Sequence, residues 1–259
     1  PQTGWVEQDP LQIWQTQQKT MLDVMQKTNV SIEEIAGLGI TNQRETTVVW
    51  EKATGKPLAP AIVWQCRRST AICEQLKAEG KESLIRKKTG LVLDPYFSAS
   101  KMRWLLNEVP RLSERMKAGE ICFGTVDSWL IWNLTAGKVF KTDVTNASRT
   151  MLCNLETASW DEELLAIFGI ELSALPEIVP SSGKLAEIDN SILGKSLPIA
   201  GIAGDQQSAL FGQACFEVGQ AKNTYGTGCF LMLNAGSKPV ESQHQLLSTI
   251  AWQIGEERT

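Results

Sequence analysis

Hydrophobic and polar positions along this chain alternate between a helical period and short strand-like runs. Leu11, Trp14 and Met21 recur at helical spacing after Asp9-Pro10, a pair typical of a helix start. Short apolar or β-branched runs predict buried strands instead. Further helices are predicted over 69–78, 98–109, 127–134, 161–168 and 206–216, and strands over 35–40, 46–50, 61–64, 121–125, 198–203, 220–224, 229–234 and 246–254.

Helices and strands that alternate in this way indicate an α/β fold, with some strands close enough for antiparallel hairpins. We expect the strand at 61–64 to pair with the strand at 46–50, across the Thr54-Gly55-Lys56-Pro57 turn. Residues 171–197 are richer in Pro, Ser and Gly and predict a connection with one short strand. The predicted helix at 206–216 follows closely on the predicted strand at 198–203.

Length and composition restrict the class of protein. Of the 259 residues 42% are hydrophobic, which suffices for a large core in one big domain or two smaller ones. The net charge is -4 and no long basic stretch occurs, so we expect neither nucleic acid nor an anionic membrane as partner. No apolar run approaches a membrane span and no secretory signal is visible, which predicts a cytoplasmic protein.

The six cysteines and the single histidine narrow the chemistry further. No Cys-x-x-Cys pair occurs, and His244 is the only histidine, which argues against a zinc site. One histidine also argues against Ser-His-Asp or Cys-His catalysis. We expect most cysteines to be reduced core residues, and His244 to lie in a solvent-exposed loop.

Asp205 is the first candidate for chemistry, because it stands where a buried strand ends and a helix begins. Ligands of α/β sheets bind at strand ends, where helix N-terminal amides also point outward. Two interpretations remain open. Asp205 is either an N-cap of the following helix or a carboxylate that accepts a proton from a substrate hydroxyl or lies near a metal ion.

Two further loops carry candidate residues. Arg44 and Glu45 lie between two predicted strands in a polar turn without Gly, Pro or Asp, and they offer a hydrogen-bond donor and an acceptor to a polyol. Thr227 and Gly228 belong to a glycine turn whose backbone amides could contact phosphate. A solvated hairpin turn is the alternative for both loops.

Three aromatic residues, Trp64, Tyr96 and Phe230, stand beside polar or turn residues. Aromatic side chains are more often core than site, yet aromatic walls also complement the C–H groups of a small polyol and exclude water. The polar loop at 146–150 receives no role from these arguments.

Six segments, taken together and in order, resemble the glycerol-phosphorylating members of the FGGY family of carbohydrate kinases. Each segment is weak alone, but the ordered set is specific and extends over nearly the whole chain. The segments are 40–47, 63–68, 94–97, 142–152, 204–207 and 223–228.

This resemblance implies a ribonuclease H-like, actin-type ATPase fold and transfer of the γ-phosphoryl group of ATP to the 3-hydroxyl of glycerol, with Mg²⁺. It implies that Asp205 is the base and lies near the metal ion, and that Thr227 and Gly228 lie against the nucleotide phosphates. It also implies that glycerol is bound by Arg44, Glu45, Trp64, Tyr96, Asp205, Gln206 and Phe230. Among these residues Gln206 assists, and Trp64 and Phe230 form the apolar wall.

The ends of the chain differ from the family pattern. Residues 1–259 do not include the Asp-Gln-Gly-Thr-like phosphate loop that the family pattern places before Gly4-Trp5, nor the second domain that we expect after residue 259. We therefore expect residues 1–259 to be the N-terminal, substrate-binding domain, incomplete at its N-terminus and without the C-terminal nucleotide-binding domain. We expect this fragment alone to be inactive and the full-length protein to be a homo-oligomer. The alternatives are a kinase for another small polyol or a ketose such as xylulose, and a non-catalytic polyol-binding module.

Overall fold

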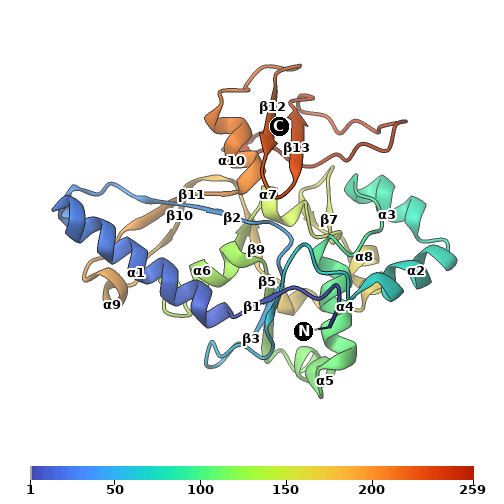
Figure 1. Ribbon diagram of the computed structural model, residues 1–259, viewed down its shortest axis with the longest axis horizontal. Coiled ribbons are helices and arrows are strands. Elements are labelled where there is room, and N and C mark those ends of the chain that lie inside the picture. The colour runs from blue at the N-terminus through green and yellow to red at the C-terminus, as the bar shows by residue number, and fades with distance from the viewer. Residues whose placement is uncertain (1) are drawn as a thin grey trace.

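A mixed five-stranded sheet organises the computed structural model, which describes residues 2–259 (Figure 1). The two strands that matter for the site, β2 at the edge of the sheet and β11 beside it, are parallel neighbours, whereas β10 runs antiparallel to β11. In sheet order the strands are β15 (Glu257–Arg258), β14 (Gln253–Ile254), β10 (Ser182–Glu187), β11 (Pro198–Gly204) and β2 (Leu38–Asn42). The predicted α/β architecture with a mixed sheet is thus confirmed.

Helices α1 (Pro10–Thr28) and α6 (Val126–Leu134) cover one face of this sheet. Asp9 caps α1, because its Oδ1 accepts a hydrogen bond of 2.9 Å from the Leu11 amide. Trp14 and Met21 pack on the core as predicted, but Leu11 is 44% exposed and Ile13 takes its place. The apolar stripe of α1 therefore runs through Ile13, Trp14 and Met21 and leaves Leu11 out.

A second core lies beneath a group of shorter helices, which gather on the right-hand side of Figure 1. The predicted helices at 69–78, 98–109 and 161–168 are present there, and two helices that the sequence analysis did not predict join them. The group consists of α2 (Thr70–Ala78), α3 (Glu82–Thr89), α4 (Ser98–Glu108), α5 (Leu112–Lys117) and α8 (Glu162–Phe168).

The predicted pairing of the strands at 46–50 and 61–64 is confirmed at one position only. β3 (Val48–Glu51) pairs antiparallel with β5 (Ile121–Gly124), and β4 (Ala61–Ile62) pairs with β1 (Glu7–Gln8). Only one isolated bridge, between Thr47 and Ile62, joins the two segments. β3 is buried on both faces, and its full four-residue register is with β5.

Two other segments differ from prediction. Residues 171–197 hold the strands β9 (Glu177–Val179) and β10 and the helix α9 (Asn190–Leu193), not one short strand; β9 pairs with β6 (Lys141–Asp143). β10 is mostly exposed, so it lacks the apolar pattern that marks a strand. The predicted strand at 246–254 is reduced to β14. The backbone amides before β14 donate to groups outside any sheet: the Ile250 amide donates to Ser148 Oγ, and the Ser248 amide to the Gly90 carbonyl.

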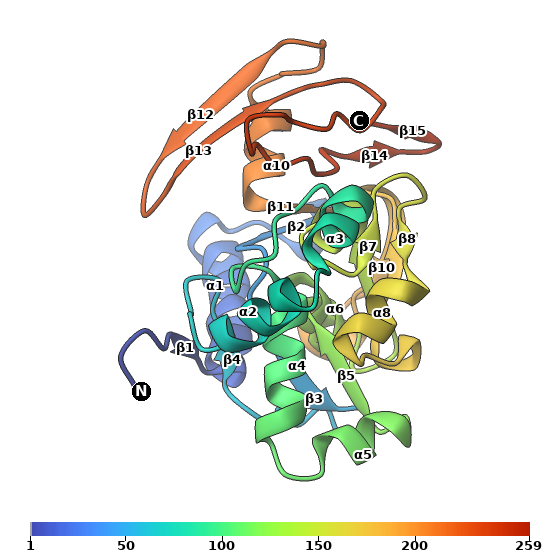
Figure 2. The same cartoon turned by 90° about the vertical axis from the view of Figure 1, so that its right-hand side faces the viewer.

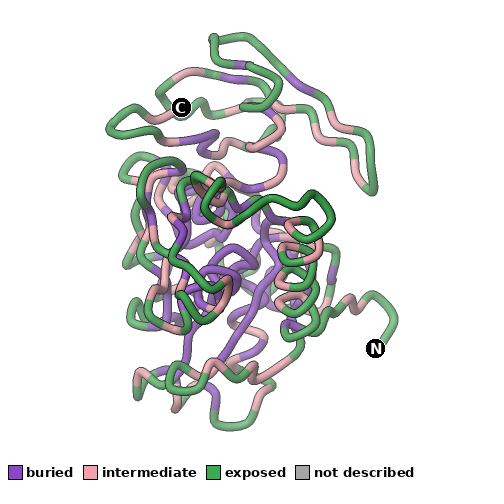
Figure 3. Tube along the Cα trace, turned by 90° about the vertical axis from the view of Figure 1, so that its left-hand side faces the viewer, coloured by how far each residue is buried: buried purple, intermediate pink, exposed green. Residues whose placement is uncertain are grey.

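An upper layer of the molecule consists of α10 (Asp205–Gly212) and the hairpin of β12 (Ala221–Tyr225) and β13 (Cys229–Leu233), together with the chain's last residues (Figure 2). Buried residues run through the interior of the main body, whereas this hairpin is mostly exposed (Figure 3). α10 ends four residues earlier than predicted, and Ala214 beyond it adopts a left-handed conformation with φ 55°.

The remaining expectations concern the cysteines and solvent exposure. All six cysteines are free and five of them are buried, while Cys229 is exposed. His244 is exposed in its loop, as predicted. Among the helices of residues 2–259, none combines the length and the hydrophobicity that crossing a membrane would require.

Candidate active site

The parallel register of β2 and β11 brings two distant loops together. Asn42, the last residue of β2, is opposite Gly204, the last residue of β11. Because parallel strands end at the same edge of a sheet, the residues that follow each strand meet there. Arg44 Nε lies 3.0 Å from Asp205 Oδ1, and Arg44 Nη1 donates a hydrogen bond of 3.1 Å to Gln207 Oε1.

The Arg44–Asp205 pair is asymmetric in its exposure to solvent. The Arg44 side chain is 4% exposed, whereas that of Asp205 is 44% exposed. Burial, and then the charge of Arg149, lowers the pKa of the Arg44 guanidinium. Although Nε is close to the carboxylate, its N–H is not aligned with it and has no hydrogen-bond acceptor among the described residues. A buried donor without an acceptor costs about 1–3 kcal/mol, so a ligand oxygen at this place would be stabilising.

Glu45 forms the buried corner of the turn after β2. Its φ of 62° lies in the left-handed region, which non-glycine residues seldom adopt. The turn is fixed by a hydrogen bond of 3.2 Å from Ser98 Oγ to the Glu45 carbonyl and by one of 2.6 Å from Arg149 Nε to Glu45 Oε1. Ser98 therefore serves this turn and does not cap α4, whose N-cap is Phe97. A solvated hairpin is excluded here.

The three predicted aromatic residues form one wall. The ring of Trp64 lies 5.6 Å from that of Tyr96 and 6.4 Å from that of Phe230, in both cases edge to face. Phe230 comes from β13, so the hairpin contributes to the same wall as the body. The Arg44 guanidinium lies 5.7 Å from the Phe230 ring centre, which joins the wall to the charged pair.

Tyr96 offers a phenol that remains protonated. Burial, and then the Glu45 charge, raises the pKa of Tyr96, so its hydroxyl can donate a hydrogen bond at neutral pH. The Tyr96 amide is held by Asp94 Oδ1 at 2.8 Å. Its carbonyl accepts from Lys101 Nζ, which also donates to the Phe97 carbonyl at 3.2 Å.

Lys101 is fully buried, and burial lowers its pKa to about 7. Between pH 7 and the ordinary pKa of 10.5 the unfolded chain binds a proton that the folded chain does not. The contribution of Lys101 to the free energy of unfolding therefore rises with pH in this window, by about 1.4 kcal/mol per pH unit. We expect urea denaturation at pH 6 to 9 to show this slope relative to Lys101→Met, and a pH-independent difference between the two proteins would contradict it.

Asp205 is the first residue of α10 and not its N-cap, a position that Gly204 occupies. Asp205 Oδ1 accepts only the neighbouring Gln206 amide, at 2.8 Å, besides its ionic contact with Arg44. The Gln206 side chain is directed toward the hairpin, where its Oε1 accepts a hydrogen bond from Lys222 Nζ. Lys222 also donates to Thr224 Oγ1 at 2.8 Å, so it connects α10 to β12.

Thr227 and Gly228 form the tip of the β12–β13 hairpin, as the simpler interpretation of the glycine turn predicts. The Gly226 amide closes the turn on the Gly228 carbonyl at 3.0 Å. The amides of Thr227 and Gly228 have no hydrogen-bond acceptor within residues 2–259. The tip therefore presents two free donors, and its contact with phosphate stays a prediction.

A buried polar network, to which the sequence analysis assigned no role, holds the ends of the two strands that carry the site. It centres on α7 (Val144–Ala147): Asn146 and Asn42 exchange hydrogen bonds of 3.0 and 3.2 Å, and Thr145 Oγ1 accepts from the Gly204 amide at 2.8 Å. These bonds tie the ends of β2 and β11 to one helix. Arg149 and Lys222 were missed as well. The one signal for Arg149 was the run at 145–150, which is polar except for Ala147.

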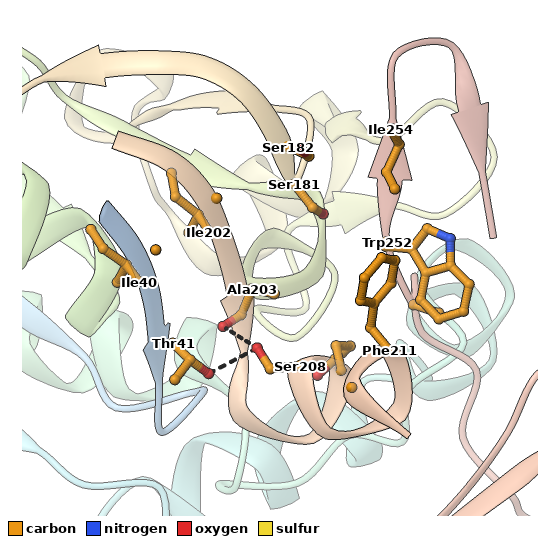
Figure 4. A pocket seen from close by; sticks show the side chains of 15 residues that line it. Ile40, Thr41, Ser181, Ser182, Ile202, Ala203, Ser208, Phe211, Trp252 and Ile254 are labelled. Atoms are coloured by element: carbon orange, nitrogen blue, oxygen red, sulfur yellow. Dashed lines mark hydrogen bonds between the residues drawn. The ribbon is translucent and has the colours of Figure 1, made fainter. Parts of the chain in front are cut away.

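A cavity of about 440 Å³ adjoins α10, but none of the predicted site residues lines it (Figure 4). It lies on the face of β2 and β11 that α1 does not cover, where Thr41 Oγ1 and Ser208 Oγ are 2.9 Å apart. The Phe211 and Trp252 rings, 5.4 Å apart, stand together at one end. The cavity and the Arg44–Asp205 pair are thus separate features of the same strand ends.

Comparison with known proteins identifies the family. A family model described as the N-terminal domain of the FGGY family of carbohydrate kinases matches residues 1–212. The chain belongs to the FGGY family of carbohydrate kinases. A crystal structure of Plasmodium falciparum glycerol kinase with ADP superposes on this FGGY domain with a TM-score of 0.93 and 39% identity, over 98% of this chain and 51% of that one. The predicted actin-type fold is thereby confirmed.

Curated relatives of this FGGY chain are also named glycerol kinases. Glycerol kinases of Symbiobacterium thermophilum and Shewanella frigidimarina are 56% and 58% identical to it, over 99% and 97% of this chain. A xylulose kinase structure from Lactobacillus acidophilus, at 24% identity and a TM-score of 0.77, shares the fold. The chain covers 51% and 50% of the two curated relatives, so it spans about half their length.

Proposed function

We propose that the whole protein transfers the γ-phosphoryl group of ATP to a terminal hydroxyl of glycerol, and that residues 1–259 form its acceptor-binding domain. The observation that carries this proposal is the buried Arg44 Nε–H without an acceptor, beside the half-exposed Asp205 carboxylate and an aromatic wall. A hydroxyl oxygen is the partner that such a donor lacks. The relatives named glycerol kinases support glycerol as the acceptor.

Glycerol presents O–H groups along one side and C–H groups along the other. Arg44 and the Tyr96 phenol can donate to its oxygens, and Glu45 and Asp205 can accept from its hydroxyls. Trp64 and Phe230 complement the C–H side and exclude water, which strengthens each of these polar contacts. The neighbouring Gln206 is directed by Lys222 and adds an amide at the edge of the site.

Asp205 has the exposure and position of a general base. Its carboxylate reaches solvent, whereas Glu45 is buried and occupied by Arg149. As the acceptor oxygen bonds to phosphorus and ADP departs, Asp205 takes the hydroxyl proton. Arg44 keeps the carboxylate oriented toward the acceptor, which is the alignment that phosphoryl transfer requires of a protein.

The described residues supply one carboxylate and two free backbone amides that would hold Mg²⁺ and the nucleotide phosphates. The described residues hold no cluster of three metal-binding side chains, but Mg²⁺ is commonly held by one or two carboxylates together with phosphate oxygens and water. Asp205 would be that carboxylate, and the free amides of Thr227 and Gly228 would contact phosphate. When bound, Mg²⁺ neutralises charge on the phosphate oxygens.

A panel of acceptors tests the proposal on the whole protein with ATP and Mg²⁺. We expect the highest kcat/KM for glycerol and a much lower value for xylulose and other ketoses, because the aromatic wall limits the room around Arg44. A preference for a ketose would replace glycerol by the larger substrate. Binding of glycerol without any phosphorylation would favour the non-catalytic polyol-binding module.

A further inference from the structure

Arg149 is a buried arginine that contacts two of the predicted acceptor residues. It is 5% exposed and follows α7. Its Nε donates the 2.6 Å hydrogen bond to Glu45 Oε1, and its guanidinium lies 5.7 Å from the Tyr96 ring and 5.0 Å from the Phe97 ring. One cation therefore holds a carboxylate and packs on two rings of the same site.

The pairing of charges around Arg44 is the opposite of what burial alone favours. Arg44 has two carboxylates in reach, Asp205 at 3.0 Å and Glu45 at 3.9 Å. The side chain of Glu45 is 2% exposed and that of Asp205 is 44% exposed. Because solvent weakens attraction, a buried guanidinium should prefer the buried carboxylate. Arg44 nevertheless makes its closer ionic contact with the exposed carboxylate of Asp205.

Arg149 accounts for this choice. Its bond occupies Glu45 Oε1, the same oxygen that Arg44 approaches to 3.9 Å. No described residue donates a hydrogen bond to the other carboxylate oxygen of Glu45, which is consequently left for a ligand. The two arginines and two carboxylates together are neutral, so a buried cluster of this kind is tolerated.

We propose that Arg149 is a positioning residue: by holding Glu45, it leaves Arg44 to orient Asp205 and leaves the second Glu45 oxygen to the acceptor hydroxyl. This inference rests on the proposed kinase function. Without Arg149, Glu45 becomes the buried partner of Arg44, the Arg44–Asp205 contact lengthens, and the Glu45 carboxylate is no longer free. Both acceptor binding and the orientation of Asp205 then suffer.

A mutant cycle between Arg149 and Glu45 tests this role in the whole protein. Arg149→Gln is expected to raise the glycerol KM by roughly 30-fold or more, the usual range for breaking a buried charge pair. Arg149→Lys keeps the positive charge beside Glu45, so its glycerol KM should lie well below that of Arg149→Gln.

The double variant decides between positioning and simple structural support. Since Arg149 acts through Glu45, adding Arg149→Gln to Glu45→Gln should change the glycerol KM by less than about threefold. The double variant removes both charges of the pair and leaves no unpaired buried charge, so it remains testable even if Arg149→Gln alone fails to fold. Additive effects, or a glycerol KM of Arg149→Gln that equals that of the unmodified protein, would overturn the proposal. Absence of glycerol phosphorylation by the unmodified protein would instead overturn the proposed function, and this inference with it.

Discussion

Replacement of Asp205 by asparagine is expected to lower kcat for glycerol phosphorylation by roughly 10²–10⁴-fold, the usual contribution of a general base. Asparagine has the same shape, and its side-chain oxygen can still accept the Gln206 amide at the start of α10. It cannot take the hydroxyl proton, and it loses the ionic contact with Arg44. Steady-state kinetics of the whole protein with ATP and Mg²⁺ measure the change.

Asp161→Asn is the matched control for this variant. Asp161 also stands at a helix start, since it caps α8 through the amides of Glu163 and Leu164, but it lies outside the predicted site. We expect its kcat to be unchanged, and circular dichroism should show the same helix content for both variants. Near-normal turnover by Asp205→Asn would remove Asp205 from the mechanism.

Gly204→Ala is expected to raise the glycerol KM by roughly tenfold or more, equivalent to about 1.4 kcal/mol of lost binding. A Cβ at this position would lie 2.5 Å from Arg44 Cδ and 2.9 Å from Gln207 Oε1, closer than atoms can approach. The backbone of Gly204, with φ -59° and ψ 150°, suits alanine, so the effect comes from space alone. Arg44 must move and lose its contacts with Asp205 and Gln207.

Two comparisons make the Gly204 result specific. Gly212→Ala, at the other end of α10, adds a Cβ that meets nothing within 4 Å and should leave KM unchanged. Arg44→Ala should raise KM by itself, and Gly204→Ala should add little to it because both act on the same side chain. A KM for Gly204→Ala equal to that of the unmodified protein would show that Arg44 does not need its present position.

The meeting of Arg44 with Asp205 was predictable from local pattern, because both residues follow apolar strands and parallel strands end at one edge. Which charges are buried was not predictable. Lys101, Arg149 and Lys222 read as ordinary surface charges in the sequence, yet all three are at least 95% buried. Their burial depends on partners far along the chain, such as Glu45 for Arg149, and local periodicity carries no information about those partners.

The strand errors have the same origin. β3 and β4 each have the composition of a strand, but their segments share only the Thr47–Ile62 bridge, and the full register of β3 is with β5, some 70 residues later. The family resemblance supplied the expected roles of Trp64 and Phe230. It supplied no distances, so the buried Arg44 donor without an acceptor emerged only from the structure.

The register between β2 and β11 also has a consequence for folding. Arg44 and Gln207 are bonded across a sequence separation of 163 residues, so the loop between them must close before this contact can form. Contacts of such high order are entropically costly and tend to form slowly. The Trp50–Trp129 contact closes a shorter loop, so tryptophan fluorescence should recover during refolding before the capacity to retain glycerol, which makes ligand retention a late marker of the native state.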